Sequence, residues 1–180
     1  MATNPSAAEP QGPPGAEIRW FTTHYVVAQD RLRLGCVLKA GDSDVLWLTQ
    51  RLANALVRQL LDWLDKTTVA DSRVADIQHR MAQQAATTKP QKRPAERVAD
   101  VPGWLVNAVQ VRIPGKTLIL TFRDEGTRAV SIRFNAEHLR RWLGVVHAQY
   151  GRAGWPLELW PEWIGEEAED QAGAPQGLLH

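Results

Sequence analysis

The sequence predicts an α+β fold, in which two βββα halves form antiparallel sheet and the helices pack on one face of it. Three observations lead to this prediction. Alternating apolar and polar residues, the pattern of half-buried strands, occur on both sides of the middle of the chain. Each group of such strands is followed by a stretch whose apolar residues recur at helical spacing. This order occurs twice, at the 86-residue offset that separates Thr49 from Asn135.

The composition is that of one ordinary globular domain. The chain has 180 residues, of which 44% are hydrophobic and 23% charged, with a formal net charge of +1. This excludes a collagen-like, disulfide-stapled or fully disordered chain. No apolar run approaches the ~20 residues of a membrane helix, and the N-terminus lacks the features of a signal peptide. We therefore expect a cytoplasmic protein without membrane contact, and the lone Cys36 agrees with a reducing compartment.

We expect a single folded domain between two disordered tails. Residues 1–16 hold four prolines among Ala, Gly and Ser, and residues 165–180 are acidic, so neither stretch has enough apolar content to offset the entropy of ordering. The domain, residues 17–164, divides into half 17–66, a helix and linker over 67–102, half 103–151, and a Trp-rich segment over 152–164.

The first half contains three predicted strands and a helix. Residues 18–28 are aromatic and β-branched, residues 31–39 alternate between apolar and basic, and residues 45–48 form a short third strand. Thr49 is a residue type that caps helices. The helix that follows has an apolar stripe wide enough to be fully buried: Leu52, Ala53, Leu56, Val57, Leu60, Leu61 and Leu64.

The second half repeats this plan. Strands are predicted over 104–113, 116–123 and 130–134, and Asn135 caps a helix that runs to Tyr150. The apolar positions of the two halves coincide at the constant offset, whereas identical residues are nearly absent. Internal duplication is one explanation. Coincidence is the other, because equal strand and helix periods produce such matches by themselves.

The connection between the halves predicts a helix and then a linker. Residues 67–86 lack Pro and Gly, and Val74, Ile77 and Met81 recur at positions i, i+3 and i+7. This predicts either a second helix or a continuation of the first. Two prolines and four basic residues follow, which indicates a solvated hinge between the halves.

No catalytic, cofactor or metal site emerges from the motifs. Gly115, Lys116 and Thr117 could end a phosphate-binding loop, but Gln110 stands where that loop needs Gly, so a hairpin turn explains them better. None of the four serines lies in a nucleophile elbow, and the five histidines lack partners at metal-ligand spacing. Cys36 is in phase with apolar residues and is expected in the core.

A basic surface is the first candidate binding site. If Leu32 and Leu34 face the core, alternation turns the residues between them to the opposite face of the sheet. Val37 and Val45 are expected there, together with seven candidate binding residues: Arg31, Arg33, Lys39, Trp47, Arg112, Arg123 and Arg133. Two interpretations stay open. The charges keep an open sheet face solvated, or they attract an anionic partner, either nucleic acid or an acidic protein.

The Trp-rich segment is the second candidate. Trp155, Trp160 and Trp163 lie within nine residues, and the prolines among them prevent a regular helix. The segment either lies across the domain and closes its core, or it is a docking peptide, since Trp is a favoured interface anchor.

These observations favour a non-catalytic interaction or accessory protein that holds another protein through the basic face, the Trp-rich segment, or both. The alternative is a nucleic-acid-binding protein that uses the same face, with the acidic tail as a competitor. Residues 157–180 carry six acids and no Lys or Arg, which leaves +7 on residues 1–156. Leu61 and Trp63 widen the apolar surface of the first helix, so they either meet the second half or form a homodimer, which we favour.

Overall fold

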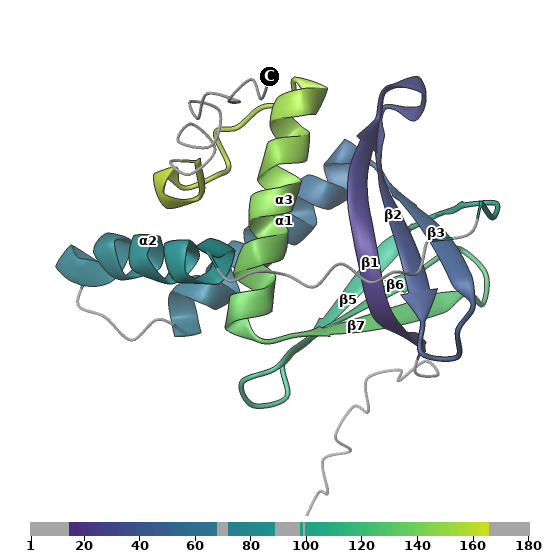
Figure 1. The fold of residues 1–180 in the computed structure, drawn as a ribbon, viewed down its shortest axis with the longest axis horizontal. Helices are drawn as coiled ribbons and strands as arrows, with labels where there is room; N and C mark the ends of the chain where they lie inside the picture. The colour runs from purple at the N-terminus through teal and green to yellow at the C-terminus, as the bar shows by residue number, and fades with distance from the viewer. Residues whose placement is uncertain (1–14, 68–71, 89–97, 99, 166–180) are drawn as a thin grey trace, which may run out of the picture.

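The computed structural model describes residues 15–67, 72–88, 98 and 100–165 (Figure 1). Seven strands form one sheet in the order β4-β3-β2-β1-β7-β6-β5, with helices beside it. The predicted α+β class is therefore confirmed. The predicted tails lie outside the described residues, except that β1 begins at Ala16.

The first three strands form an antiparallel meander, as predicted. β1 (Ala16–Val26) pairs with β2 (Arg31–Leu38), and β2 pairs with β3 (Ser43–Leu48). A short 3₁₀ helix, η1 (Val27–Gln29), joins β1 to β2. The turn ends at Asp30 in the left-handed region, at φ 46°, a conformation that Asp tolerates better than most residues. The hydroxyl of Tyr25 donates to the carboxylate of Asp30 at 2.8 Å and fixes this turn.

The strand predicted over 104–113 is two strands. β4 (Trp104–Leu105) pairs in parallel with β3, whereas β5 (Ala108–Arg112) pairs antiparallel with β6 (Leu118–Arg123). The change of partner takes place between two neighbouring residues. The amide of Val106 donates to the carbonyl of Trp47 at 2.9 Å, and the amide of Asn107 donates to the carbonyl of Arg123 at 2.8 Å. The sheet thus curls until its two edge strands are consecutive in the chain.

The sheet is mixed, so the prediction of a purely antiparallel sheet is wrong. β7 (Ala129–Phe134) pairs antiparallel with β6, but it also pairs in parallel with the start of β1, where Ala16 lies opposite Val130. The third strand of each half therefore meets the first strand of the other. An alternating pattern specifies which face of a strand is buried but not the direction of its neighbour, which is why the sequence did not reveal these pairs.

The two halves also share a register. Leu34 lies opposite Leu46, and Leu120 lies opposite Ile132. Leu120 follows Leu34, and Ile132 follows Leu46, by the 86 residues expected from the sequence. The inward-facing residues of β2 and β3 and of β6 and β7 consequently occupy equivalent places in the core.

Two long helices cover the sheet. α1 (Gln50–Thr67) begins after Thr49, whose hydroxyl accepts from the amide of Leu52 at 3.3 Å. α3 (Ala136–Ala153) begins after Asn135, whose side chain accepts from the amide of His138 at 2.8 Å. Both predicted caps are confirmed. Gly154 ends α3 at φ 65°, the left-handed conformation that suits glycine.

The core is one cluster shared by the strands and both long helices. Leu60, Leu64, Leu139 and Leu143 are fully buried together with the inward-facing residues of the strands. Leu61 and Trp63 belong to the same cluster. These two side chains therefore meet the rest of the chain, which is the first of the two alternatives considered for them and removes the reason for favouring a homodimer.

A second helix, α2 (Ser72–Thr88), follows α1 as a separate element. It packs against α3, where the side-chain amide of Gln83 donates to the carbonyl of Arg140 at 3.1 Å and Arg141 donates to the carbonyl of Ala86. The chain after α3 folds back beside α2 and α3 (Figure 1). No helix among the described residues is both long and apolar enough to span a membrane.

Candidate functional site

The outer face, meaning the face of the sheet turned away from the helices, is partly covered on β2 and β3. A Cβ added to Gly35 would lie 3.3 Å from Cγ1 of Val98, and one added to Gly103 would lie 2.8 Å from Cγ1 of Val45. The chain that leads into β4 therefore passes over these strands. Val37 and Val45, which alternation places on the outer face, are buried.

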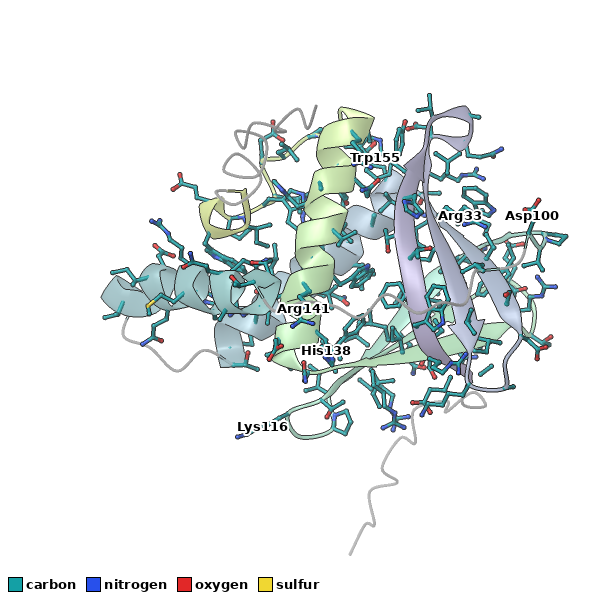
Figure 2. The ribbon with its side chains drawn as sticks, in the orientation of Figure 1. Arg33, Asp100, Lys116, His138, Arg141 and Trp155 are labelled. Atoms are coloured by element: carbon teal, nitrogen blue, oxygen red, sulfur yellow. The ribbon has the colours of Figure 1, made fainter. Side chains whose placement is uncertain are left out.

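Arg33, Trp47 and Arg123 lie on the outer face near the closure of the sheet. Arg33 is opposite Trp47, and it lies on the side of β2 away from the helices (Figure 2). Trp47 and Arg123 provide the two carbonyls that bind Val106 and Asn107. These residues, with Arg31 next to Arg33 in phase on β2, form a first group of candidate binding residues.

Lys39, Arg112 and Arg133 form a second group. Lys39 Nζ and Arg133 Nε lie 2.7 and 3.3 Å from the same carboxylate oxygen of Glu17. The hydrogen bond from Lys39 is the largest of the effects that lower the pKa of Glu17. Arg112 aligns with Ile119 on β6, which aligns with Arg133 on β7. Because the sheet curls, the seven predicted residues form two groups and not one flat basic platform.

The three tryptophans of the C-terminal segment are buried. Trp155, Trp160 and Trp163 are between 6% and 8% exposed and belong to the core cluster. Trp155 lies at the end of α3, with its ring 5.5 Å from that of Tyr25 and 5.0 Å from that of Tyr150 (Figure 2). The segment thus has the core-closing arrangement, and these rings are not exposed as docking anchors.

α2 turns its apolar residues outward. Val74, Ile77 and Met81 are 43%, 57% and 65% exposed, whereas His79 and Gln83 are buried against the rest of the molecule. Residues at these spacings fall on opposite sides of a helix. We call Val74, Ile77 and Met81 the α2 stripe. Its periodicity predicted the helix, but a helix of an isolated domain would turn such a stripe inward.

An acidic cleft of about 620 Å³ lies between α1, α2 and residues 158–163. Four carboxylates line it, from Asp62, Asp65, Asp76 and Glu158, together with the single guanidinium of Arg58. Trp160 and Trp163 contribute aromatic walls. The cleft thus combines negative charge with apolar surface.

His79 joins the cleft to the interior through a buried arginine. Arg140 donates to Nδ1 of His79 at 2.9 Å, because a guanidinium cannot accept. Nε2 of His79 therefore carries the proton and lies 3.3 Å from a carboxylate oxygen of Asp65. The ring of Trp163 stacks on His79 at 4.8 Å and lies under the Arg140 guanidinium at 5.0 Å. Desolvation, and secondarily Arg140, lower the pKa of His79, so the imidazole is neutral at pH 7.

Neither His79 nor Cys36 is placed to act as a general base or a nucleophile. Both nitrogens of His79 are occupied, and burial raises the pKa of Cys36 to about 12, far above that of a reactive thiolate. Among the residues that the structure describes, no three His, Cys, Asp or Glu side chains are grouped closely enough to hold a metal ion.

The cleft could not be predicted from the sequence, because three distant segments form it. The i, i+3 spacing of Asp62 and Asp65 is ordinary on a solvated helix face, and His79 lies in a polar stretch of α2. The sequence did contain an indirect indication. The apolar stripe and His79 fall on opposite sides of α2, which indicates that the polar side of the helix could pack against the rest of the chain.

Comparisons with protein-family models, with curated proteins and with solved structures find no match to this chain.

Proposed function

We propose that this protein is a non-catalytic interaction protein and that the α2 stripe contacts its protein partner. The observation that carries the proposal is the orientation of α2, which buries His79 and Gln83 and exposes Val74, Ile77 and Met81. Exposing large apolar side chains to water is unfavourable by roughly 25 cal/mol per Å². A second apolar surface laid on the stripe removes that cost. Exposed apolar clusters of this kind are typical of contact surfaces.

The test replaces Ile77 and Met81 by Ser in the full-length chain. Both side chains are more than half exposed, so we expect the melting temperature to change by less than about 2 °C. Nuclease-treated pull-downs should lose the partners that the unmodified chain retains. The matched control replaces Val27 and Ile113 by Ser, because these residues are equally exposed and apolar but lie elsewhere. Retention of the same partners by the Ile77/Met81 variant would contradict the proposal.

A second candidate is nucleic-acid binding on the outer face. It is favoured by Arg31, Arg33 and Arg112, for which no ion pair occurs within the described ranges. Guanidinium groups without a carboxylate partner are suited to phosphate. The nuclease step in the same pull-down separates the candidates, since partners that disappear with nuclease support this one. Trp47, a member of the first group, would provide a stacking surface, and the acidic tail remains the proposed competitor.

A further inference from the structure

The acidic cleft is a feature of the described structure that the proposed function does not use. Its volume of about 620 Å³ is within the range of roughly 300 to 1,000 Å³ that is usual for ligand sites. Three elements form it, since α1, α2 and the segment that contains Trp160 and Trp163 each contribute to its walls. It is separate from the α2 stripe, which lies on the opposite side of α2 from His79.

The charge of the cleft is strongly negative. Among the residues that line the cleft, Asp62, Asp65, Asp76 and Glu158 face one cation, Arg58, since His79 is neutral. Lys66, outside the lining, pairs with Asp62. This negative region lies on a body whose residues 1–156 together carry +7. A cationic ligand would therefore be attracted to the cleft in preference to the basic outer face.

The carboxylates are accessible to a ligand. The side chains of Asp62 and Asp65 are 69% and 63% exposed. Asp62 pairs with Lys66 at 3.0 Å, but Lys66 is 76% exposed, and surface pairs of this kind contribute little and exchange readily. An incoming ammonium or guanidinium group can replace this partner without disturbing the fold.

The aromatic walls select an organic cation. Trp163 is held between elements by the guanidinium of Arg140, 5.0 Å over its ring, and by His79, stacked on it at 4.8 Å, so its position in the cleft wall is fixed. Trp160, the second aromatic wall, is 8% exposed and keeps a fixed position between Tyr150 and His147. Carboxylates with rigid indole surface suit a Lys or Arg side chain, whose apolar stem and charged end need both.

We propose that the acidic cleft binds a basic peptide segment, with one Lys or Arg side chain against the tryptophan walls and neighbouring cations at the rim carboxylates. The occupant is a peptide because the carboxylates are distributed over three elements around a space that holds several side chains. An extended segment with alternating cations reaches several of them at once. The site functions whether or not a protein partner covers the α2 stripe.

The experiment titrates the ¹⁵N-labelled full-length protein with the peptide Gly-Lys-Gly-Lys-Gly, acetylated at its N-terminus and amidated at its C-terminus. We expect the indole N–H signals of Trp160 and Trp163 and the amides of Asp65 and Asp76 to shift in about 50 mM salt. The double substitution Asp76→Asn with Glu158→Gln should weaken binding about tenfold, as expected from removing two accessible charges. The matched control is Asp42→Asn with Glu125→Gln, which removes equal charge from exposed positions elsewhere and should weaken binding less than twofold.

Three results would overturn the proposal. One is equal weakening in the two double variants, which would mean that only net charge matters. Another is binding of the same peptide with both lysines acetylated, since that ligand carries no cation. The third is tighter binding by a free linear polyamine than by the peptide. Titrating the Ile77/Met81 variant keeps this test separate from the proposed function, because the peptide should bind it unchanged.

Discussion

Gly103 shows how a single residue permits the chain to cover the outer face. Its backbone lies beneath the ring of Trp47 and beside Val45, where any Cβ would contact both side chains. Trp47 in turn is opposite Arg33 on β2. The absence of a side chain at position 103 therefore allows the chain to enter β4 directly under an aromatic ring. No motif marks such a glycine, because its requirement arises only when the segment is packed on the strands.

We predict that Gly103→Ala destabilises the fold by about 1–3 kcal/mol, since the buried Val45 and the ring of Trp47 must both shift. Urea denaturation measures this as a lower midpoint with an unchanged slope. The control is Gly151→Ala in α3, where an added Cβ meets nothing and helix propensity favours Ala by roughly 0.5–1 kcal/mol. Equal stability of Gly103→Ala and the unmodified chain would contradict the packing described.

At the scale of elements, α2 is the least conventional part of the fold. It is attached to α3 through polar contacts, because Arg140 binds His79 and Gln83 binds the carbonyl of Arg140. The contact between Arg140 and His79 depends on the protonation of the imidazole, whereas the Gln83 contact and the apolar packing of α1 do not. The attachment of α2 should therefore be sensitive to acid.

We predict that the free energy of unfolding falls as the pH is lowered from about 6.5 toward the depressed pKa of folded His79. In this window the unfolded chain binds more protons than the folded one, because the unfolded histidine has its ordinary value of 6.5 while desolvation and Arg140 keep the folded one neutral. The contribution of His79 to the free energy of unfolding is fully present at pH values above the pKa of the unfolded histidine. Burial lowers the pKa of His147 as well, so it acts in the same direction.

The measurement is urea denaturation of the unmodified chain and of His79→Gln at several pH values between about 7.5 and 4.5. Gln keeps a donor and an acceptor but does not titrate in this range. The variant should lose part of the acid sensitivity and keep the part that arises from His147. Identical pH dependence in the two proteins would show that His79 is not responsible.

The elements also show what the sequence can and cannot reveal. Strands β2 and β3 and the caps Thr49 and Asn135 were predictable, because alternation and capping are local properties. The break at Val106 and the parallel pairs were not, since they depend on which distant strand is adjacent. The candidate site divides in the same way. The basic residues of the outer face could be predicted, because alternation along a strand shows which residues share a face. The cleft could not be predicted, because it forms only where three elements meet.

At the scale of the whole molecule, charge is unevenly distributed. Residues 1–156 carry +7, and residues 157–180 carry −6. The two groups of basic residues lie on the outer face, while Glu158 lines the acidic cleft at the other side of the sheet. A tethered acidic stretch is held at an effective concentration on the order of millimolar near its own body. We therefore expect this stretch to compete with any anionic ligand of the outer face.

We predict that deleting residues 165–180 tightens binding of a single-stranded oligonucleotide several-fold at about 50 mM salt and has little effect near 0.5 M. The control carries Arg33→Gln and Arg112→Gln, with and without the same deletion. Fluorescence anisotropy of the labelled oligonucleotide gives the affinities. If the deletion tightens binding equally in both backgrounds, net charge alone explains the effect and the tail does not compete for these arginines.

The parallel pairing of β1 with β7 also determines when the protein can fold during synthesis. Ala16 lies opposite Val130, so the start of β1 cannot pair until a segment more than a hundred residues later has left the ribosome. β3 likewise waits for β4, which follows the whole of α1 and α2. Contacts so distant along the chain are reached only after a large loss of chain entropy, which makes folding slow. Until then the apolar surfaces of the first half remain exposed, so we expect the nascent chain to be the form most prone to aggregation.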